Sequence, residues 1–135
     1  MASKRNTSLL IAAIIALLFG ALTILSGGRA LFGGAEARAA IGNAVPFVLW
    51  FNFFAGFAYV LAGIGLFLQH RPAVWLSIAI LAGTVVVSVA LGVHILQGGA
   101  YEMRTIGAMS LRALVWAGIS AVALRHLGQG QRTAI

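Results

Sequence analysis

A short stretch of the chain, HILQGGAYEMRTIGAMSLR at 94–112, places a histidine, a tyrosine, a glutamate and two arginines within an otherwise apolar sequence. Side chains of these types could bind an ionic ligand or relay a proton, and ionisable residues inside membrane segments are functional candidates by default. Together with one amide upstream, the candidate ligand or polar cluster consists of Asn52, His94, Tyr101, Glu102, Arg104 and Arg112.

Arg112 is the member of this cluster that needs a partner most. It follows Thr105 by seven residues, so its Cα would lie about 10 Å below the start of an apolar helix with a rise of 1.5 Å per residue. We expect Glu102 to reach it from the preceding loop and form an ion pair. The alternative is an arginine that extends to the interface without a further role.

His94 carries less information by itself. A metal site would need further nitrogen or carboxylate ligands, and the neighbouring loops supply Glu36 and Glu102. We expect His70 and His126 on the opposite side of the membrane, which also argues against a haem held between two histidines. The interpretation is an interfacial hydrogen-bonding group, with no metal and no cofactor.

The elements that must position these residues are membrane helices. The chain has 135 residues, of which 61% are hydrophobic and 8% charged, whereas soluble domains carry about 25% charged residues. Continuous apolar runs of about 20 residues cross a bilayer as helices, and the alternation typical of a barrel is missing. The expected fold is an all-α bundle of four transmembrane helices in one domain, 1–135, with helices at about 9–27, 45–68, 73–96 and 106–124.

Several classes of protein are excluded by composition and motifs. The sequence contains no cysteine, which rules out thiol and disulfide chemistry. Its net charge of +7 is scattered over membrane-flanking positions, so it marks topology and not a nucleic-acid surface. No nucleophile elbow, phosphate loop, zinc-protease helix or pair of catalytic carboxylates occurs, and we expect no enzyme and no catalytic residue.

Basic residues indicate how the chain lies in the membrane. In a four-pass chain, Lys4, Arg5, Arg71, Arg125 and Arg132 fall on one side, opposite to Arg29, Arg38 and Arg104. The positive-inside rule then places both termini in the cytoplasm of a bacterial inner membrane. The segments 28–43 and 98–105 would face outward. A cleaved signal peptide is the alternative for the first segment, but its apolar run is long and favours a retained helix.

Small residues repeat at helical spacing on three of the expected helices, which is typical of close packing in lipid. Frequent glycine and alanine alone are the other explanation. The three proposed contact stripes are Ala12, Ala16, Gly20 and Thr23; Asn52, Gly56, Tyr59 and Gly63; and Gly83, Val87, Ala90 and His94.

The two outer segments resemble each other. GGAEARAAIG at 33–42 and GGAYEMRTIG at 98–107 share Gly-Gly-Ala, Glu-x-Arg and Ile-Gly with one gap, and TILSGG at 23–28 resembles HILQGG at 94–99. This echo would make the bundle two related helical hairpins. Glycine pairs also end helices for local reasons, so coincidence remains the alternative.

Aromatic residues are concentrated in the run FVLWFNFFAGF at 47–57. Part of this run would form an interfacial aromatic belt, and the rest would pack in the core, contact lipid or wall an apolar ligand pocket. Trp116 lies too deep in the fourth helix for such a belt. We therefore expect its ring to face inward.

The run FNFFAGFAYVLAGIGLFLQHR at 51–71, with its small residues, GIGL and basic turn, resembles the second helix of DoxX-like four-helix membrane proteins. The resemblance covers about 44–125 and implies a four-helix bundle associated with redox or oxidase partners. On this basis the first hypothesis is a non-enzymatic accessory or assembly subunit, embedded in the bilayer and bound to a protein partner or to further copies of itself. The alternative is a binding module or carrier for a small apolar or ionic ligand at the polar cluster.

Overall fold

The computed structural model describes residues 7–128, all of whose regular structure is helical. Five α-helices are followed by one π-helical turn, and their bounds are α1 Thr7–Phe32, α2 Ala35–Ile41, α3 Pro46–Phe67, α4 Pro72–Leu96, α5 Met103–Ala123 and η1 Leu124–Gly128. Lys4, Arg5 and Arg132, which contributed to the predicted orientation, lie outside the described residues.

Four helices are long and apolar enough to cross a membrane, namely α1, α3, α4 and the continuous stretch Met103–Leu127. The all-α class and the four membrane-crossing helices of the sequence prediction are confirmed. Two details differ. The first helix extends to Phe32 instead of ending near residue 27, and the expected outer segment 28–43 contains the short helix α2.

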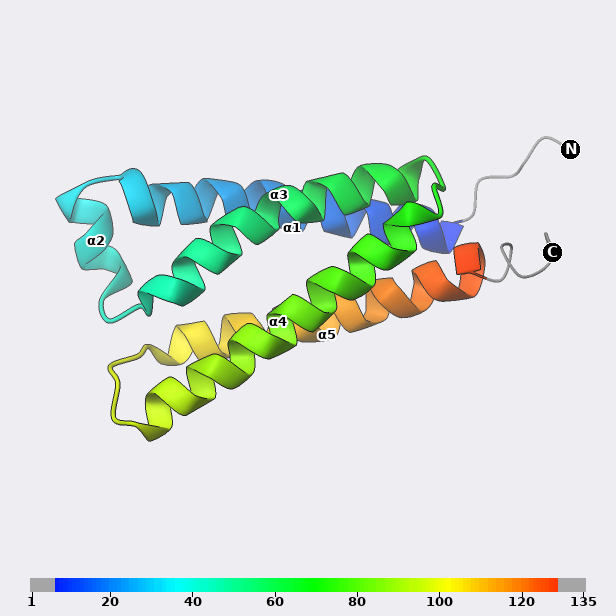
Figure 1. Ribbon diagram of the computed structural model, residues 1–135. Helices are drawn as coiled ribbons and strands as arrows, with labels where there is room; N and C mark the ends of the chain where they lie inside the picture. Colours follow the sequence, from blue (N-terminus) through cyan, green and yellow to red (C-terminus); the bar gives the residue numbers. More distant parts are fainter. Residues whose placement is uncertain (1–6, 129–135) are drawn as a thin grey trace, which may run out of the picture.

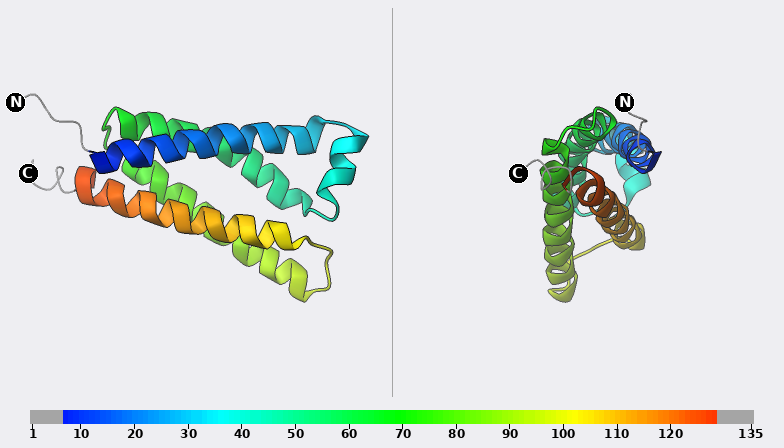
Figure 2. Two further views of the ribbon diagram at one scale, coloured as in Figure 1. Left: turned by 180° about the vertical axis from the view of Figure 1, so that it is seen from behind. Right: turned by 90° about the vertical axis from the view of Figure 1, so that its right-hand side faces the viewer.

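The long helices form two antiparallel hairpins, α1 with α3 and α4 with α5 (Figure 1). They meet at the end that holds the α3–α4 link, near which both ends of the described chain also lie, and diverge toward the end that holds α2 (Figure 2). We call these the terminal end and the α2 end. The short link forces α3 and α4 to be neighbours, and its residue Gln69 has a positive φ of 58°.

Glycines bring α1 and α3 into close contact. A Cβ added at Gly20 would lie 2.9 Å from the carbonyl oxygen of Gly56 and closer still to Val60, and one added at Gly63 would lie 2.8 Å from Leu17. Small residues allow this approach, which supplies packing where lipid gives no hydrophobic drive. The predicted stripes on these two helices are confirmed, except that Asn52 is half-buried.

The predicted stripe on α4 is confirmed only in part. Gly83 faces Phe51 of α3, and Val87 packs against a buried apolar cluster, but Ala90 is exposed. The buried face of α4 instead carries Ala73, Val74, Ser77, Ile80, Thr84 and Leu91. Small residues do not mark the inside of a helix whose lipid face is equally apolar, whereas the hydroxyls of Ser77 and Thr84 do, because lipid cannot hydrogen-bond them.

The centre of the bundle is aromatic. Trp116 and Tyr59 are fully buried, and their ring centroids are 4.9 Å apart. This contact joins α5 to α3 and confirms that Trp116 faces inward. Its indole nitrogen forms no hydrogen bond within the described part of the chain.

The two hairpins do not reproduce the sequence echo in their connections. Residues 35–41 fold as α2, whereas 99–102 have no regular structure and helix begins only at Met103. A shared ancestry of the hairpins stays a prediction.

Candidate functional site

A cavity of about 220 Å³ lies at the α2 end, between α1, α3 and α5. We call it the polar cavity, because seven of its lining residues carry polar side chains: Thr23, Ser26, Asn52, Glu102, Arg104, Thr105 and Arg112. Four members of the predicted cluster, Asn52, Glu102, Arg104 and Arg112, are thus brought together from α3, α5 and the residue that caps α5.

Arg112 lies well inside the membrane-crossing part of α5. It follows Met103 by nine residues, which places its Cα about 14 Å from the start of the helix. Its Nη2 donates a hydrogen bond to Thr23 Oγ1 over 3.2 Å, and its Nε is buried without a partner among the described residues. The hydrogen-bond partner of this charged group is therefore a neutral hydroxyl, and the Tyr59 hydroxyl also lies nearby.

The predicted ion pair between Glu102 and Arg112 is not formed. Glu102 Oε2 instead accepts a hydrogen bond from the backbone N–H of Asn43 at 2.9 Å. Arg104 donates from Nη2 to the carbonyl oxygen of Ala40 over 3.2 Å. Both contacts tie the start of α5 to the segment around the end of α2, and this leaves the Glu102 carboxylate at the mouth of the polar cavity.

Asn52 supplies a second unsatisfied group at the polar cavity. Its Oδ1 is buried and accepts no hydrogen bond from any described residue. Buried polar atoms without partners are uncommon in folded proteins. Asn52 and Arg112 line the same cavity, so one bound molecule could satisfy an acceptor on the first and donors on the second.

Tyr59 lies beside Arg112, although it does not line the polar cavity. Its hydroxyl lies near the Arg112 guanidinium and the Thr84 hydroxyl, although it forms no hydrogen bond with any described residue. Thr84 Oγ1 donates to the carbonyl oxygen of Ile80 over 2.7 Å. Hydroxyls of Thr23 on α1 and Tyr59 on α3 therefore lie near the Arg112 charge.

His94 and Tyr101 do not belong to the polar cavity. His94 Nε2 is 2.9 Å from the carbonyl oxygen of Ala100, and its ring meets that of Phe47 edge to face at 6.1 Å. Tyr101 is exposed. Within residues 7–128, no group of three histidine, aspartate or glutamate side chains could hold a metal ion.

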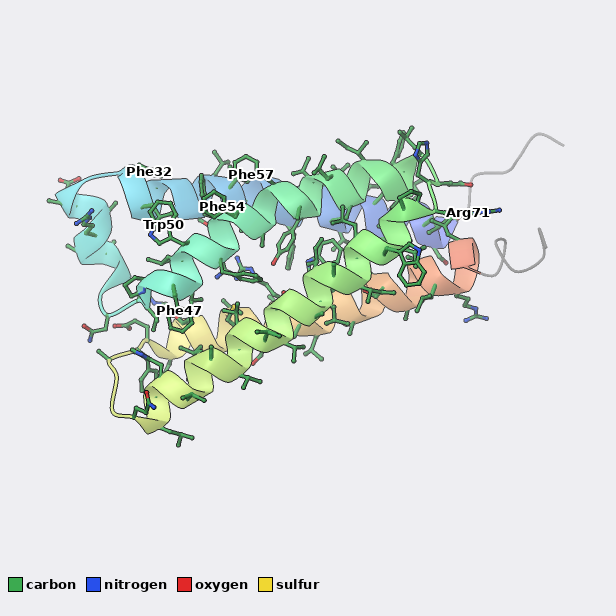
Figure 3. The ribbon with its side chains drawn as sticks, in the orientation of Figure 1. Phe32, Phe47, Trp50, Phe54, Phe57 and Arg71 are labelled. Atoms are coloured by element: carbon green, nitrogen blue, oxygen red, sulfur yellow. The ribbon has the colours of Figure 1, made fainter. Side chains whose placement is uncertain are left out.

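The aromatic run of α3 covers the outside of the bundle more than the cavity. Phe32, Trp50, Phe54 and Phe57 lie over α1 and α3 toward the α2 end, far from Arg71 at the terminal end (Figure 3). Their exposed fractions range from 42% to 65%, and Phe32 and Trp50 meet edge to face at 5.8 Å. Such an exposed apolar face suits contact with lipid or its interface, and none of these four residues lines the polar cavity.

Sequence reasoning missed the partner that Arg112 actually has. Thr23 was expected only in a packing stripe, and Ser26 and Thr105 were not expected at the site. Thr23 and Ser26 interrupt an apolar helix with hydroxyls three residues apart, and that spacing was the available signal.

No family model, no curated protein and no solved structure matches the chain. The fold and the site define the protein as a four-helix integral membrane protein with a polar cavity at one end of its bundle.

Proposed function

We propose that the protein is a non-enzymatic membrane protein that binds a small anionic ligand in the polar cavity, with Arg112 as the main binding group. One observation carries this proposal. Arg112 lies inside a membrane-crossing helix, and its sole hydrogen bond among the described residues goes to the neutral oxygen of Thr23.

A guanidinium in this position has lost much of its hydration. Charged groups in membrane segments are costly and usually pair with an opposite charge or reach water. The polar cavity gives Arg112 space for a small carboxylate or phosphate group, which a guanidinium binds through parallel hydrogen bonds. A donor on the same ligand would satisfy Asn52 Oδ1.

The mouth of the polar cavity favours the entry of anions. Two arginines and one glutamate line the cavity, so its formal charge is +1. The backbone N–H of Asn43 already bonds the Glu102 carboxylate, which reduces the repulsion that this residue exerts on an incoming anion. Arg104 stands at the entrance and adds attraction.

Thermal unfolding in a neutral detergent tests the proposal. Butyrate should stabilise the wild-type protein, whereas butyramide should not, because the amide lacks the negative charge that Arg112 would bind. A ligand that binds the folded state alone adds about 2.7 kcal/mol of stability at a hundred times its dissociation constant. Arg112→Gln should abolish the effect. Arg125→Gln is the matched control, because Arg125 is exposed at the terminal end. The proposal would be rejected if butyrate stabilised the Arg112→Gln variant as much as the wild type, or if it did not stabilise the wild type. Arg112 would then be an arginine that only reaches water.

The structure supports ligand binding more directly than the accessory role, because the polar cavity supplies a place for a ligand. An accessory or assembly role, a protein partner or homo-oligomer, and the resemblance to DoxX-like proteins stay predictions.

We also propose that both termini are cytoplasmic and that the polar cavity opens to the outside of a bacterial inner membrane. Both ends of the described chain lie at the same end of the bundle as Arg71. In a four-pass chain the basic residues on the side of the termini are Lys4, Arg5, Arg71, Arg125 and Arg132. They outnumber the basic residues on the side of the polar cavity, which favours a cytoplasmic location for the termini.

A further inference from the structure

We propose that the ligand is a single-chain anionic amphiphile, with a long-chain carboxylate as the simplest example. Its head would lie on Arg112 and its chain along the seam between α1 and α5. This inference rests on the proposed function, because it takes the Arg112 site as given and assigns the chemical class of the molecule that occupies it.

The polar cavity continues into a hollow that opens between α1 and α5. This second hollow has a volume of about 250 Å³ and shares Thr23, Ser26, Ala108 and Arg112 with the polar cavity. Its remaining lining is apolar and consists of Phe19, Leu22 and Leu111. Arg112 therefore stands where a polar space meets an apolar one, which is the arrangement that an amphiphile requires.

A third hollow, of about 370 Å³, follows along the same seam toward the terminal end. Ile15 on its α1 side is one turn from Phe19, and Val115 on its α5 side is one turn from Leu111. Residues four apart share a helix face, so the second and third hollows lie end to end. We call them together the α1–α5 groove.

The α1–α5 groove is long enough for an acyl chain. On α5 it extends from Leu111 to Val122, which corresponds to about 16 Å at 1.5 Å per residue. One leaflet of a bilayer has a hydrocarbon thickness of roughly 15 Å. The groove therefore accommodates a chain of about the length found in membrane lipids.

The packing of the bundle explains why this groove is open. The helices within each hairpin, α1 with α3 and α4 with α5, make more close contacts than α1 and α5 make with each other. Leu114 is 72% exposed and Leu22 is 63% exposed on the two walls. In a bilayer such a groove fills with acyl chains, because lipid and groove are equally apolar. Selection among chains must come from the Arg112 charge at its end.

Two features favour a single-chain acid over a two-chain phospholipid. Among the three hollows, the apolar lining beside Arg112 belongs to a single groove, which gives a place to one chain. Arg112 also lies about 14 Å from the start of α5, which is deeper than the headgroups of the surrounding bilayer. A small carboxylate at this depth would lie in the polar cavity of about 220 Å³, and it would bring fewer polar groups into the membrane than a larger headgroup.

Two glycines of α5 provide a matched pair of variants. A Cβ added at Gly118 or at Gly107 meets nothing within 4 Å, so α5 tolerates a larger side chain at both positions. Gly118 lines the α1–α5 groove, whereas Gly107 lines none of the three hollows. Gly118→Phe should obstruct the chain and leave Arg112 untouched, and Gly107→Phe is the control.

The experiment uses the full chain in nanodiscs of phosphatidylcholine, with hexadecanoate that carries a photoreactive diazirine at mid-chain. We expect crosslinks to residues of the α1–α5 groove, and we expect unlabelled hexadecanoate to displace the probe about tenfold better than hexadecanol, since a charge-assisted contact is lost in the alcohol. Gly118→Phe should reduce the crosslinking about tenfold through steric exclusion, and Gly107→Phe should leave it unchanged.

The outcomes separate this inference from the proposed function. Suppose that butyrate stabilises the protein through Arg112. If Gly118→Phe then leaves the crosslinking unchanged, or if hexadecanol displaces the probe as well as hexadecanoate does, the inference is overturned and the proposed function stands. If butyrate binding does not depend on Arg112, both fail. If native mass spectra show a dimer that Gly118→Phe converts to a monomer, a second copy occupies the groove and the inference is overturned.

Discussion

Arg112 on α5 donates a hydrogen bond to Thr23 on α1 over 3.2 Å, across a sequence separation of 89 residues. This contact links the two hairpins on the side where they diverge, and α1 and α5 have few other contacts. It also holds the guanidinium beside the polar cavity. On the proposal that Arg112 binds an anion, Thr23 therefore positions the binding group as well as joining the two helices.

Removal of the Thr23 hydroxyl tests this role. Thr23→Val keeps the shape of the buried side chain but removes the acceptor of Arg112, and a polar partner left without its bond costs about 1–3 kcal/mol. We expect the variant to unfold at lower temperature in detergent and to bind butyrate more weakly. Thr23→Ser keeps the hydroxyl and should bind butyrate as the wild type does. Identical losses in both variants would assign the effect to packing.

The close approach of α1 and α3 gives a prediction about stability alone. A methyl group at Gly20 would collide with the carbonyl oxygen of Gly56 at 2.9 Å, and overpacking of this kind costs roughly 1–3 kcal/mol. Gly20→Ala should therefore lower the thermal stability. Gly118→Ala, with open space around its Cβ, should not. A Gly20→Ala variant as stable as Gly118→Ala would contradict the contact.

The contact between Glu102 and the Asn43 backbone predicts local protection. Glu102→Ala removes the acceptor of the Asn43 N–H, and one hydrogen bond of about 0.5–1.5 kcal/mol corresponds to roughly 2- to 10-fold faster exchange. Hydrogen exchange read by NMR measures this rate. Glu36→Ala, a change of the exposed carboxylate in α2, should leave Asn43 unchanged. An unaltered exchange rate of Asn43 in Glu102→Ala would show that other contacts hold the α2–α3 connection against the α4–α5 connection.

The orientation can be tested in a chain without cysteine. Single cysteines at Ala35 and Ala100 should react with an impermeant reagent in intact cells, since the α2 end is proposed to face outward. A cysteine at Gln69, in the α3–α4 link, should react only after the membrane is permeabilised. The reverse pattern would invert the bundle and place the polar cavity on the cytoplasmic side.

Much of the fold could be predicted from the sequence, because apolar runs of membrane length have few alternatives to helices. The ends of α3 and α4 were placed within one residue. Helix α2 was missed because its seven residues are too few for a periodic signal. Glu36 in its first turn and Arg38 in its last turn do suit the dipole of a helix. The buried face of α4 was predicted only in part, because apolar side chains face both lipid and core.

The candidate site could be predicted only in part. Asn52, Glu102, Arg104 and Arg112 do line one cavity. The number of membrane crossings that precede each of them places all four at the same end of the bundle. The partner of Arg112 could not be predicted, since a carboxylate is the expected neighbour of a membrane arginine and Glu102 is close in sequence. The structure gives Arg112 a hydroxyl from a distant helix instead.

The Arg112 side chain reports most directly on whether the polar cavity binds an anion. Its Nε–H is buried and has no partner among the described residues, so its resonance in arginine labelled with ¹⁵N should move, and its exchange with water should slow, when butyrate is added. An Arg112→Lys variant assigns the resonance, and Arg125 provides the unaffected control. An Arg112 resonance that stays unchanged at butyrate concentrations which stabilise the protein would contradict anion binding at this residue.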